Sequence, residues 1–328
     1  NVTQNDLPVF GGVYDPNLGS PDKWKCVHCN NCKPKCLGHF GYLTIKYPLP
    51  TMPAAIKTVV HYAKVICLKC GAFMLGDKRL KGVRKEDLLS KYAAASHMKK
   101  KKSQDSNKQI KVNDTCPQCN EPHPMVALNM ATIARRQFHT VLKQTMFDKT
   151  TGDEIETPLF YHKLLEAFNR VSDDTVRILG KPLSSHPRNL LSYFLPIPSN
   201  IIRPDKKVSA GNRSGSDDLT KFLKFIVEQN LQLPDIIPDV IDSELAEKYY
   251  ELGERYYSLH LSSADANAAR GNQSLYAGYD GIGGRIPNKK GRIRNDLMGG
   301  RSFLTGRSVI SGDPQLPLDV LGMPIFMA

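Results

Sequence analysis

The 328-residue sequence has no apolar run close to the ~18 residues that a membrane-spanning helix requires. An apolar signal-peptide core is also missing from its first residues. It contains no P-loop, no Gly-x-Ser-x-Gly step and no His-Glu-x-x-His step, so three common catalytic signatures are excluded. With 41% hydrophobic residues it can bury a sizeable core, and its length fits two or three domains. A chain that starts at Asn1 without a methionine is expected to be a fragment.

Acidic residues are too few to balance the basic ones: 45 Lys and Arg face 32 Asp and Glu, which gives a net charge of +13. Such a surplus indicates a polyanionic partner, usually nucleic acid and less often an anionic membrane face. The densest basic stretch runs from Arg285 to Arg307 and contains one acid, Asp296. Its glycines and lack of interleaved aromatics predict contacts to phosphates without base reading. The candidate contacts are Lys289, Lys290, Arg292, Arg294, Arg301 and Arg307.

Two further expectations concern the cationic segments. The basic stretch is expected to be anchored by its own apolar residues, which are Ile293, Leu297, Met298, Phe303 and Leu304. A second cationic segment, residues 99–111, has Lys99 to Lys102 in a row and is expected to be a solvated, mobile loop. Because ordering such a loop on DNA costs entropy, its lysines are predicted to matter less than the basic stretch.

The eight cysteines are clustered, and all except Cys36 belong to a Cys-x-x-Cys step. In a large chain without a leader, this clustering is typical of metal binding in a reducing compartment rather than of a disulfide framework. The pairs Cys67, Cys70 and Cys116, Cys119 predict a zinc site with four thiolates, since each step places two of them on one side of a tight loop.

The first cysteine cluster has two interpretations. Cys26, Cys29, Cys32 and Cys36 have the spacing of a bacterial iron–sulfur run, although Leu37 stands where proline is expected. Replacing Cys32 by His39 instead gives a zinc site with three thiolates and one imidazole, which is favoured. Both metal sites would then have four protein ligands and no open position, so they are interpreted as structural and not catalytic.

Hydrophobic periodicity predicts helices from about residue 155 onward. One helix is expected to start at Thr157 and Pro158, and a short one to run from Ser172 to Gly180. The acidic pairs Asp173–Asp174 and Asp217–Asp218 fall at predicted helix starts, where capping explains them.

Two longer helices are predicted to begin at Asp218 and Ser243 and to lie antiparallel as a hairpin. Tyr249, Leu252 and Tyr256 are expected to form part of its packed seam. The apolar tip of the hairpin is expected to be exposed and therefore to bind a partner, through Leu233, Ile236 and Ile237.

Motifs of high specificity run from about residue 11 to residue 324. They include GGVYDPNLG at 11–19, CLGHFG at 36–41, SHP at 185–187, PIP at 196–198, RP at 203–204, DDLT at 217–220, KGRIRNDLMGGR at 290–301 and RSVISGDP at 307–314. Together they resemble the N-terminal clamp region of the largest subunit of multisubunit DNA-directed RNA polymerase.

The resemblance implies an α+β fold: an irregular, zinc-stabilised clamp domain with an antiparallel helical hairpin and a basic switch segment. It implies a clamp head with two zinc sites at 1–125, the clamp core and lid at 126–217, the clamp helical hairpin at 218–264, and the rudder with the DNA-contacting switch at 265–328. The implied zinc ligands, which leave Cys32 spare, are Cys26, Cys29, Cys36, His39, Cys67, Cys70, Cys116 and Cys119.

The resemblance also implies partners and a reaction. The chain would be part of a nucleotidyltransferase without holding a catalytic residue, because the Asp-rich loop that binds Mg²⁺ in the family is missing from this sequence. The implied partners are template DNA, the RNA–DNA hybrid, other polymerase subunits, notably the second-largest, and transcription factors at the hairpin, with no membrane. The expected location is intracellular: the nucleus, or the cytoplasm or virion for a viral chain.

Two points qualify the resemblance. The short lid and the Ser185–His186–Pro187 step are similar to versions from large DNA viruses, whereas Phe303 stands where the family usually has an acid. The alternative function is a free-standing, zinc-dependent nucleic-acid-binding transcription factor without catalysis.

Overall fold

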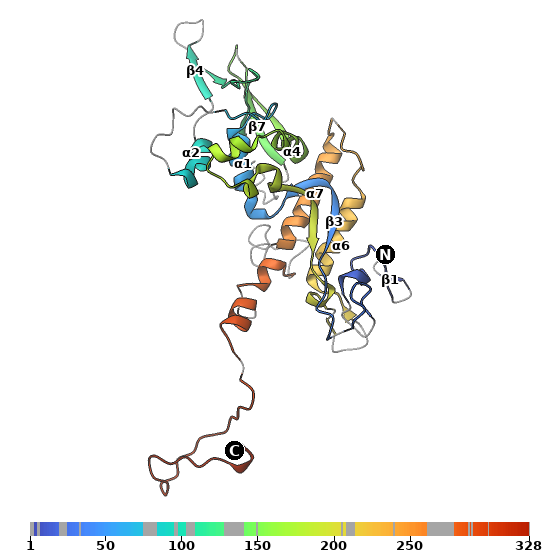
Figure 1. Cartoon of the computed structure of the whole chain (residues 1–328), viewed down its shortest axis with the longest axis vertical. Coiled ribbons are helices and arrows are strands. Elements are labelled where there is room, and N and C mark those ends of the chain that lie inside the picture. The colour runs from blue at the N-terminus through green and yellow to red at the C-terminus, as the bar shows by residue number, and fades with distance from the viewer. Residues whose placement is uncertain are drawn as a thin grey trace. The chain divides into compact units, whose positions relative to one another are not determined.

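A computed structural model provides the structure of the chain. It describes residues 3–4, 7–19, 25–32, 34–74, 84–94, 98–102, 109–127, 141–148, 150–204, 206–207, 214–238, 240–260, 279–287, 289, 291–300 and 302–327. The chain divides into two units, Asn1–Gly284 (unit 1) and Arg285–Ala328 (unit 2). Unit 1 contains the described strands and α-helices (Figure 1). It also contains the main hydrophobic core.

A strand pair and a helical hairpin form one part of unit 1. β3 (Gly41–Pro50) pairs antiparallel with β9 (Leu191–Ile197), and α6 (Asp218–Leu231) packs against α7 (Ser243–His260) (Figure 1). The β3–β9 register shifts between Thr44 and Leu49. There the Asn230 side chain of α6 accepts the Lys46 N–H (2.8 Å) and donates to the Thr44 carbonyl (3.1 Å). The helical hairpin therefore provides hydrogen-bond partners for backbone groups of β3 at the point where the strand register shifts.

The other part of unit 1 surrounds a three-stranded antiparallel sheet. The sheet consists of β6 (Met125–Ala127), β7 (Val141–Phe147) and β8 (Glu154–Phe160), with β7 in the middle. The helices nearby are α1 (Ile56–Val65), α2 (Leu88–Ala94), α4 (Tyr161–Asn169) and α5 (Asp173–Ile178). The remaining strand pairs are β1 (Thr3–Gln4) with β2 (Leu7–Pro8), β4 (Met98–Lys102) with β5 (Gln109–Asn113), and β10 (Lys206–Lys207) with β11 (Ser214–Gly215).

One hydrophobic core joins the two parts. The Tyr47 ring of β3 stacks on the Tyr249 ring of α7 with centroids 4.1 Å apart. The Tyr47 hydroxyl also accepts the N–H of Tyr161 at the start of α4 (2.8 Å). These contacts place the hairpin, the long strand pair and α4 around the same buried cluster.

The predicted mixed helix and sheet content is confirmed, as are both helices of the hairpin. α6 and α7 begin at the predicted residues, and Tyr249, Leu252 and Tyr256 are buried in their seam. The short helix α5 is capped by Ser172, whose hydroxyl accepts the Thr175 N–H at 3.3 Å, as the sequence predicted.

Three predictions are wrong. Thr157 and Pro158 do not start a helix but lie in β8, where pairing with β7 overrides local propensity and Pro158 occupies an edge strand. Lys99–Lys102 do not form a loop but lie in β4. At the hairpin tip Leu233 is buried, at 3% exposure, and Ile237 packs against the core, while Ile236 is exposed as expected.

Unit 2 has little regular structure of its own. A single π-helical turn, Arg292–Leu297, is its longest regular element among the residues described. The apolar residues that were expected to anchor it are exposed, including Leu297 and Phe303, so that expectation is wrong for the unit taken by itself. Among the described helices of both units, none combines the length and the apolar character needed to cross a membrane.

Candidate metal centres and polar contacts

Three Cys-x-x-Cys loops share one backbone conformation. They start at Cys26, Cys67 and Cys116. In each loop, the backbone N–H of the first cysteine donates to the carbonyl of the residue five positions later. The backbone carbonyl of the same cysteine accepts the N–H of the residue four positions later, and all of these distances are 2.8 to 3.0 Å. The residue after the second cysteine has a positive φ: Asn30 (55°), Gly71 (76°) and Asn120 (57°). Glycine and asparagine adopt this conformation most readily, so the local sequence itself favours this loop, which we call a knuckle.

Two of these knuckles meet to form centre 2, which comprises Cys67, Cys70, Cys116 and Cys119. The Sγ atoms of Cys67 and Cys119 are 3.6 Å apart, as are those of Cys70 and Cys116. A zinc ion with Zn–S bonds of ~2.3 Å requires tetrahedron edges of about 3.8 Å. The four thiols therefore fit the ion, and neighbouring Met74 completes a small apolar cluster around them.

Two thiols of centre 2, those of Cys67 and Cys116, have pKa values shifted in opposite directions. Burial raises the pKa of the Cys67 thiol to about 12. Burial also raises the pKa of the Cys116 thiol, but hydrogen bonds from the N–H groups of Cys119 and Gln118, together with the nearby thiols, outweigh it and lower the pKa to about 7. Since the thiolate is the form that binds metal, the backbone N–H groups around Cys116 favour the form that a zinc site requires.

The third knuckle supplies half of centre 1, which comprises Cys26, Cys29, Cys36 and His39. All four ligand atoms lie within 4.8 Å of one another, and Cys36 Sγ is 3.8 Å from His39 Nε2. Cys32 is not in the group that the structure gathers here; its carbonyl instead accepts the N–H of Cys36 at 3.1 Å. The arrangement therefore matches the zinc set with one imidazole and not the iron–sulfur set.

The Cys36–His39 half of centre 1 is not a knuckle, and the rest of unit 1 holds it in place. Gly38 has a φ of 85°, and a Cβ on it would lie 1.8 Å from the Ser199 hydroxyl. A Cβ on Gly19 would likewise lie 2.8 Å from the Gly38 Cα. The His39 N–H donates to the Leu18 carbonyl at 3.1 Å. Only glycine permits this close approach of three chain segments.

A buried arginine connects the same segments. The Arg203 side chain is fully buried and donates to the Pro198 carbonyl (3.2 Å), the Asn200 side chain (2.7 Å), the Thr220 hydroxyl (3.2 Å) and the Val13 carbonyl. We call these residues, with Ser199, the Arg203 node. Asn200 extends it by donating to the carbonyls of Asp15 (3.0 Å) and Gly19 (3.1 Å).

The Arg203 node was not predicted as a site. Its residues lie in or between the motifs at 11–19, 196–198, 203–204 and 217–220, but an arginine followed by proline carries no sign of burial in a single sequence. The signal that could have found it is that these motifs are rich in glycine and proline and lie far apart along the chain, which is typical of loops that need each other to fold.

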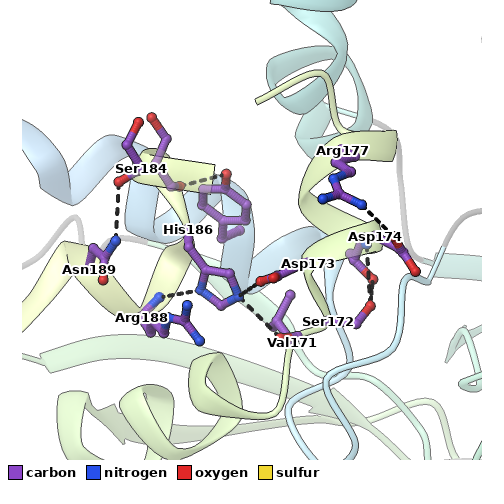
Figure 2. Close-up of polar contacts among 12 residues, drawn as sticks. Val171, Ser172, Asp173, Asp174, Arg177, Ser184, His186, Arg188 and Asn189 are labelled. Carbon is purple, nitrogen blue, oxygen red and sulfur yellow. Dashed lines mark hydrogen bonds and ion pairs between the residues drawn. The ribbon is translucent and has the colours of Figure 1, made fainter. Parts of the chain in front are cut away.

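A buried histidine performs a similar structural role near α5. Figure 2 shows His186 accepting the N–H of Arg188 at Nδ1 (3.2 Å), with Nε2 3.1 Å from the Val171 carbonyl and 3.8 Å from an Asp173 carboxylate oxygen. The ring therefore donates from Nε2 and joins the Ser185–Pro187 turn to the start of α5. Nothing in these contacts positions a nucleophile, which agrees with the interpretation of Asp173 as a helix-start residue.

The predicted nucleic-acid contacts are only partly described. Lys289, Arg292, Arg294 and Arg307 are exposed in unit 2, whereas Lys290 and Arg301 lie outside the described residues. Arg292 pairs with Asp296 at 2.7 Å, and this pairing, with a hydrogen bond from Asn295, lowers the pKa of the Asp296 carboxyl. The exposed cations are thus available, and the single acid of the segment neutralises one of them.

Comparison with known proteins assigns the family. The family described as RNA polymerase Rpb1, domain 1, matches residues 1–297. The chain belongs to the RNA polymerase Rpb1 family. It represents the N-terminal region of the largest subunit, so the resemblance stated from the motifs is confirmed.

Relatives of this Rpb1 chain occur in viruses, archaea and eukaryotes. It is 30% identical over 342 residues to the DNA-directed RNA polymerase RPB1 homolog of African swine fever virus (isolate Pig/Kenya/KEN-50/1950), covering 100% of this chain and 22% of the relative. It is 27% identical to the subunit Rpo1N of Sulfolobus acidocaldarius, covering 99% and 35%, and 28% identical to RPB1-A of Trypanosoma brucei brucei, covering 92% and 18%. The chain therefore spans about a fifth of the viral relatives' length.

Proposed function

We propose that this chain is the clamp part of a DNA-directed RNA polymerase, which holds template DNA and the RNA–DNA hybrid during transcription. The proposal rests on the family match over residues 1–297. It is supported by the exposed cations of the basic stretch from Arg285 to Arg307, which the resemblance identifies as the switch. The nucleotidyl transfer itself would take place elsewhere in the complete enzyme, where the Asp-rich loop binds Mg²⁺.

In this proposal, zinc stabilises the clamp without taking part in the reaction. Cys26, Cys29, Cys36 and His39 would hold one ion, and the four cysteines of centre 2 would hold the other. Each set already supplies four ligands, which leaves no position for substrate or water. Their contribution is to fix loops that have little core of their own.

The proposed contacts are the basic residues of the 285–307 stretch, the apolar residues of unit 2 and the tip of the hairpin. The chain would bind the phosphate backbone through Lys289, Lys290, Arg292, Arg294, Arg301 and Arg307. Other polymerase subunits, notably the second-largest, would surround unit 2, whose apolar side chains are exposed. A transcription factor would dock at the tip of the helical hairpin, where Ile236 is 84% exposed.

The test removes two exposed arginines from the assembled polymerase. Arg292→Ala with Arg294→Ala should lower the retention of template and reduce the log–log salt slope of DNA binding by about 0.9 per lost phosphate contact on duplex. The effect should not depend on base sequence, because phosphates carry no base code. A matched control, Lys57→Ala with Lys91→Ala, removes two exposed cations from α1 and α2 and should bind like the parent. Parent-like binding by the arginine variant would contradict the proposed contact.

A further inference from the structure

We propose that β4 and β5, here called the lysine ribbon, form a second nucleic-acid-binding surface that contacts the phosphate backbone of a duplex. The inference extends the proposed function to another part of the chain and rests on it. Lys99 to Lys102 all lie in β4, and Lys111 lies in β5. The sequence from 98 to 113 contains one acid, Asp105.

The strand register distributes the lysines over both faces of the ribbon. Lys100 lies directly opposite Lys111 and shares a face with Lys102, whereas Lys99 and Lys101 occupy the other face. A ribbon with cations on both faces suits a groove with a phosphate wall on each side, and the major groove of B-DNA, about 12 Å wide, admits a two-stranded ribbon. An acidic protein docked on one face would leave the other lysines unused, so the register favours nucleic acid.

The register of the lysine ribbon places like charges at paired positions. The strand register pairs Lys100 with Lys111, and like charges at paired positions destabilise a sheet. A two-stranded hairpin is also marginal by itself. The ribbon is held at its base instead, because β5 leads directly into the centre 2 knuckle, which is closed by a bridge between Thr115 and Pro122. A bound polyanion would therefore stabilise a register that pairs like charges.

The position and order of the ribbon also suit a ligand. Figure 1 shows β4 projecting away from the helices of unit 1. β4 and β5 form a two-stranded sheet, so neither outer edge of the ribbon has a strand partner among the residues described. The sequence analysis predicted that the lysines of this segment matter less for DNA binding, because a mobile loop would have to become ordered on binding. As a strand pair the backbone is already ordered, so the entropy cost of binding DNA is smaller than assumed.

The test measures DNA binding by the assembled polymerase over a range of salt. Lys100→Gln, Lys102→Gln and Lys111→Gln together remove one face of the ribbon and should reduce the log–log slope on duplex DNA by about 2 to 3. The control variant carries Lys57→Gln, Lys91→Gln and Lys224→Gln, which remove equal charge from exposed positions on α1, α2 and α6. It should keep the parent slope, and both variants should keep the parent metal content.

The salt slope of the triple variant either supports or overturns the proposed contact of the lysine ribbon with a duplex. A reduced slope on duplex DNA, or on an RNA–DNA hybrid alone, supports the ribbon and identifies which duplex it contacts. An unchanged slope on both duplexes, or an equal reduction in the control variant, overturns the proposal. Binding of polyglutamate, which stands for an acidic protein, is measured as well. If the triple variant loses polyglutamate binding but keeps duplex binding, the partner is an acidic protein and the proposal is also overturned. If the triple variant loses metal, Lys99→Gln with Lys101→Gln tests the other face. The Arg292/Arg294 variant is measured in parallel, so failure of the switch contact is distinguished from failure of the ribbon.

Discussion

The two candidate metal centres of unit 1 are built in different ways. In centre 2 both halves are knuckles whose backbone hydrogen bonds lie within six consecutive residues, so the local sequence shapes each half. In centre 1 only the Cys26 half is a knuckle, while the Cys36–His39 half is set by Gly19, Leu18 and Ser199. The difference teaches that one centre can be recognised from spacing alone, whereas the other depends on distant segments meeting at the Arg203 node.

The largest expected effect comes from removing a ligand of centre 2. Cys67→Ser should lose one metal ion per chain and most of the stability of the β4–β5 region, since zinc binding contributes ~10–16 kcal/mol in small fingers. Elemental analysis and thermal unfolding measure both effects. Cys32→Ser is the matched control and should change neither; metal loss in that variant would show that the ligand set of centre 1 is wrong.

The next largest effect should come from the Arg203 node. Arg203→Lys keeps the charge but cannot replace the several hydrogen bonds of the buried guanidinium, and removing such a buried group costs about 3 kcal/mol. Urea denaturation should show this loss, and chelator competition should show weaker metal retention at centre 1 only. Arg188→Lys, at an exposed position, should be neutral. Equal weakening at both centres would contradict the difference drawn between them.

A smaller effect is expected from Gly38→Ala. The positive φ is strained for alanine, and the Ser199 hydroxyl must move, so a loss of about 2 kcal/mol is expected with faster metal release from centre 1. Gly300→Ala, where a Cβ would meet nothing within 4 Å, provides the control. Normal metal retention in the Gly38 variant would mean that the Cys36–His39 loop does not need its contact with Ser199.

The smallest effect should come from the local geometry of centre 2. Asn120 has a φ of 57°, so Asn120→Ala should cost about 1 kcal/mol and Asn120→Gly should be close to neutral. Thermal unfolding of the two variants side by side checks this. A larger loss with glycine than with alanine would show that the asparagine side chain matters more than its backbone conformation.

The sequence predicted the elements whose signals are local. The ligand set of centre 2 was predicted from spacing, because each Cys-x-x-Cys step encodes its own loop, whereas spacing left two interpretations of the first cluster. The start of α6 was predicted from the Asp217–Asp218 pair, and the Asp217 carboxylate caps the helix by accepting the Leu219 N–H at 2.9 Å. The start of α7 was predicted from the apolar stripe that follows Ser243. The four-part division of the chain and the individual DNA contacts remain predictions.

The errors share a physical cause, which is tertiary pairing that overrides local propensity. Thr157 and Pro158 have the pattern of a helix start, yet β7 recruits them into a sheet edge. Four consecutive lysines suggest a loop, yet β5 pairs with them. Leu233 was expected at an exposed tip, but the Lys46 ammonium donates to its carbonyl at 2.7 Å, and its side chain is buried. No single-sequence pattern specifies such partners.

The central claim is that unit 1 is organised around two metal centres with four protein ligands each. Elemental analysis of the native protein, together with its absorbance spectrum, tests this most directly. We expect two zinc ions per chain, no iron and no visible colour, and we expect each of Cys36→Ser and Cys116→Ser to lose one ion while keeping the other. A single zinc ion, or iron with acid-labile sulfide in a brown protein, would contradict it.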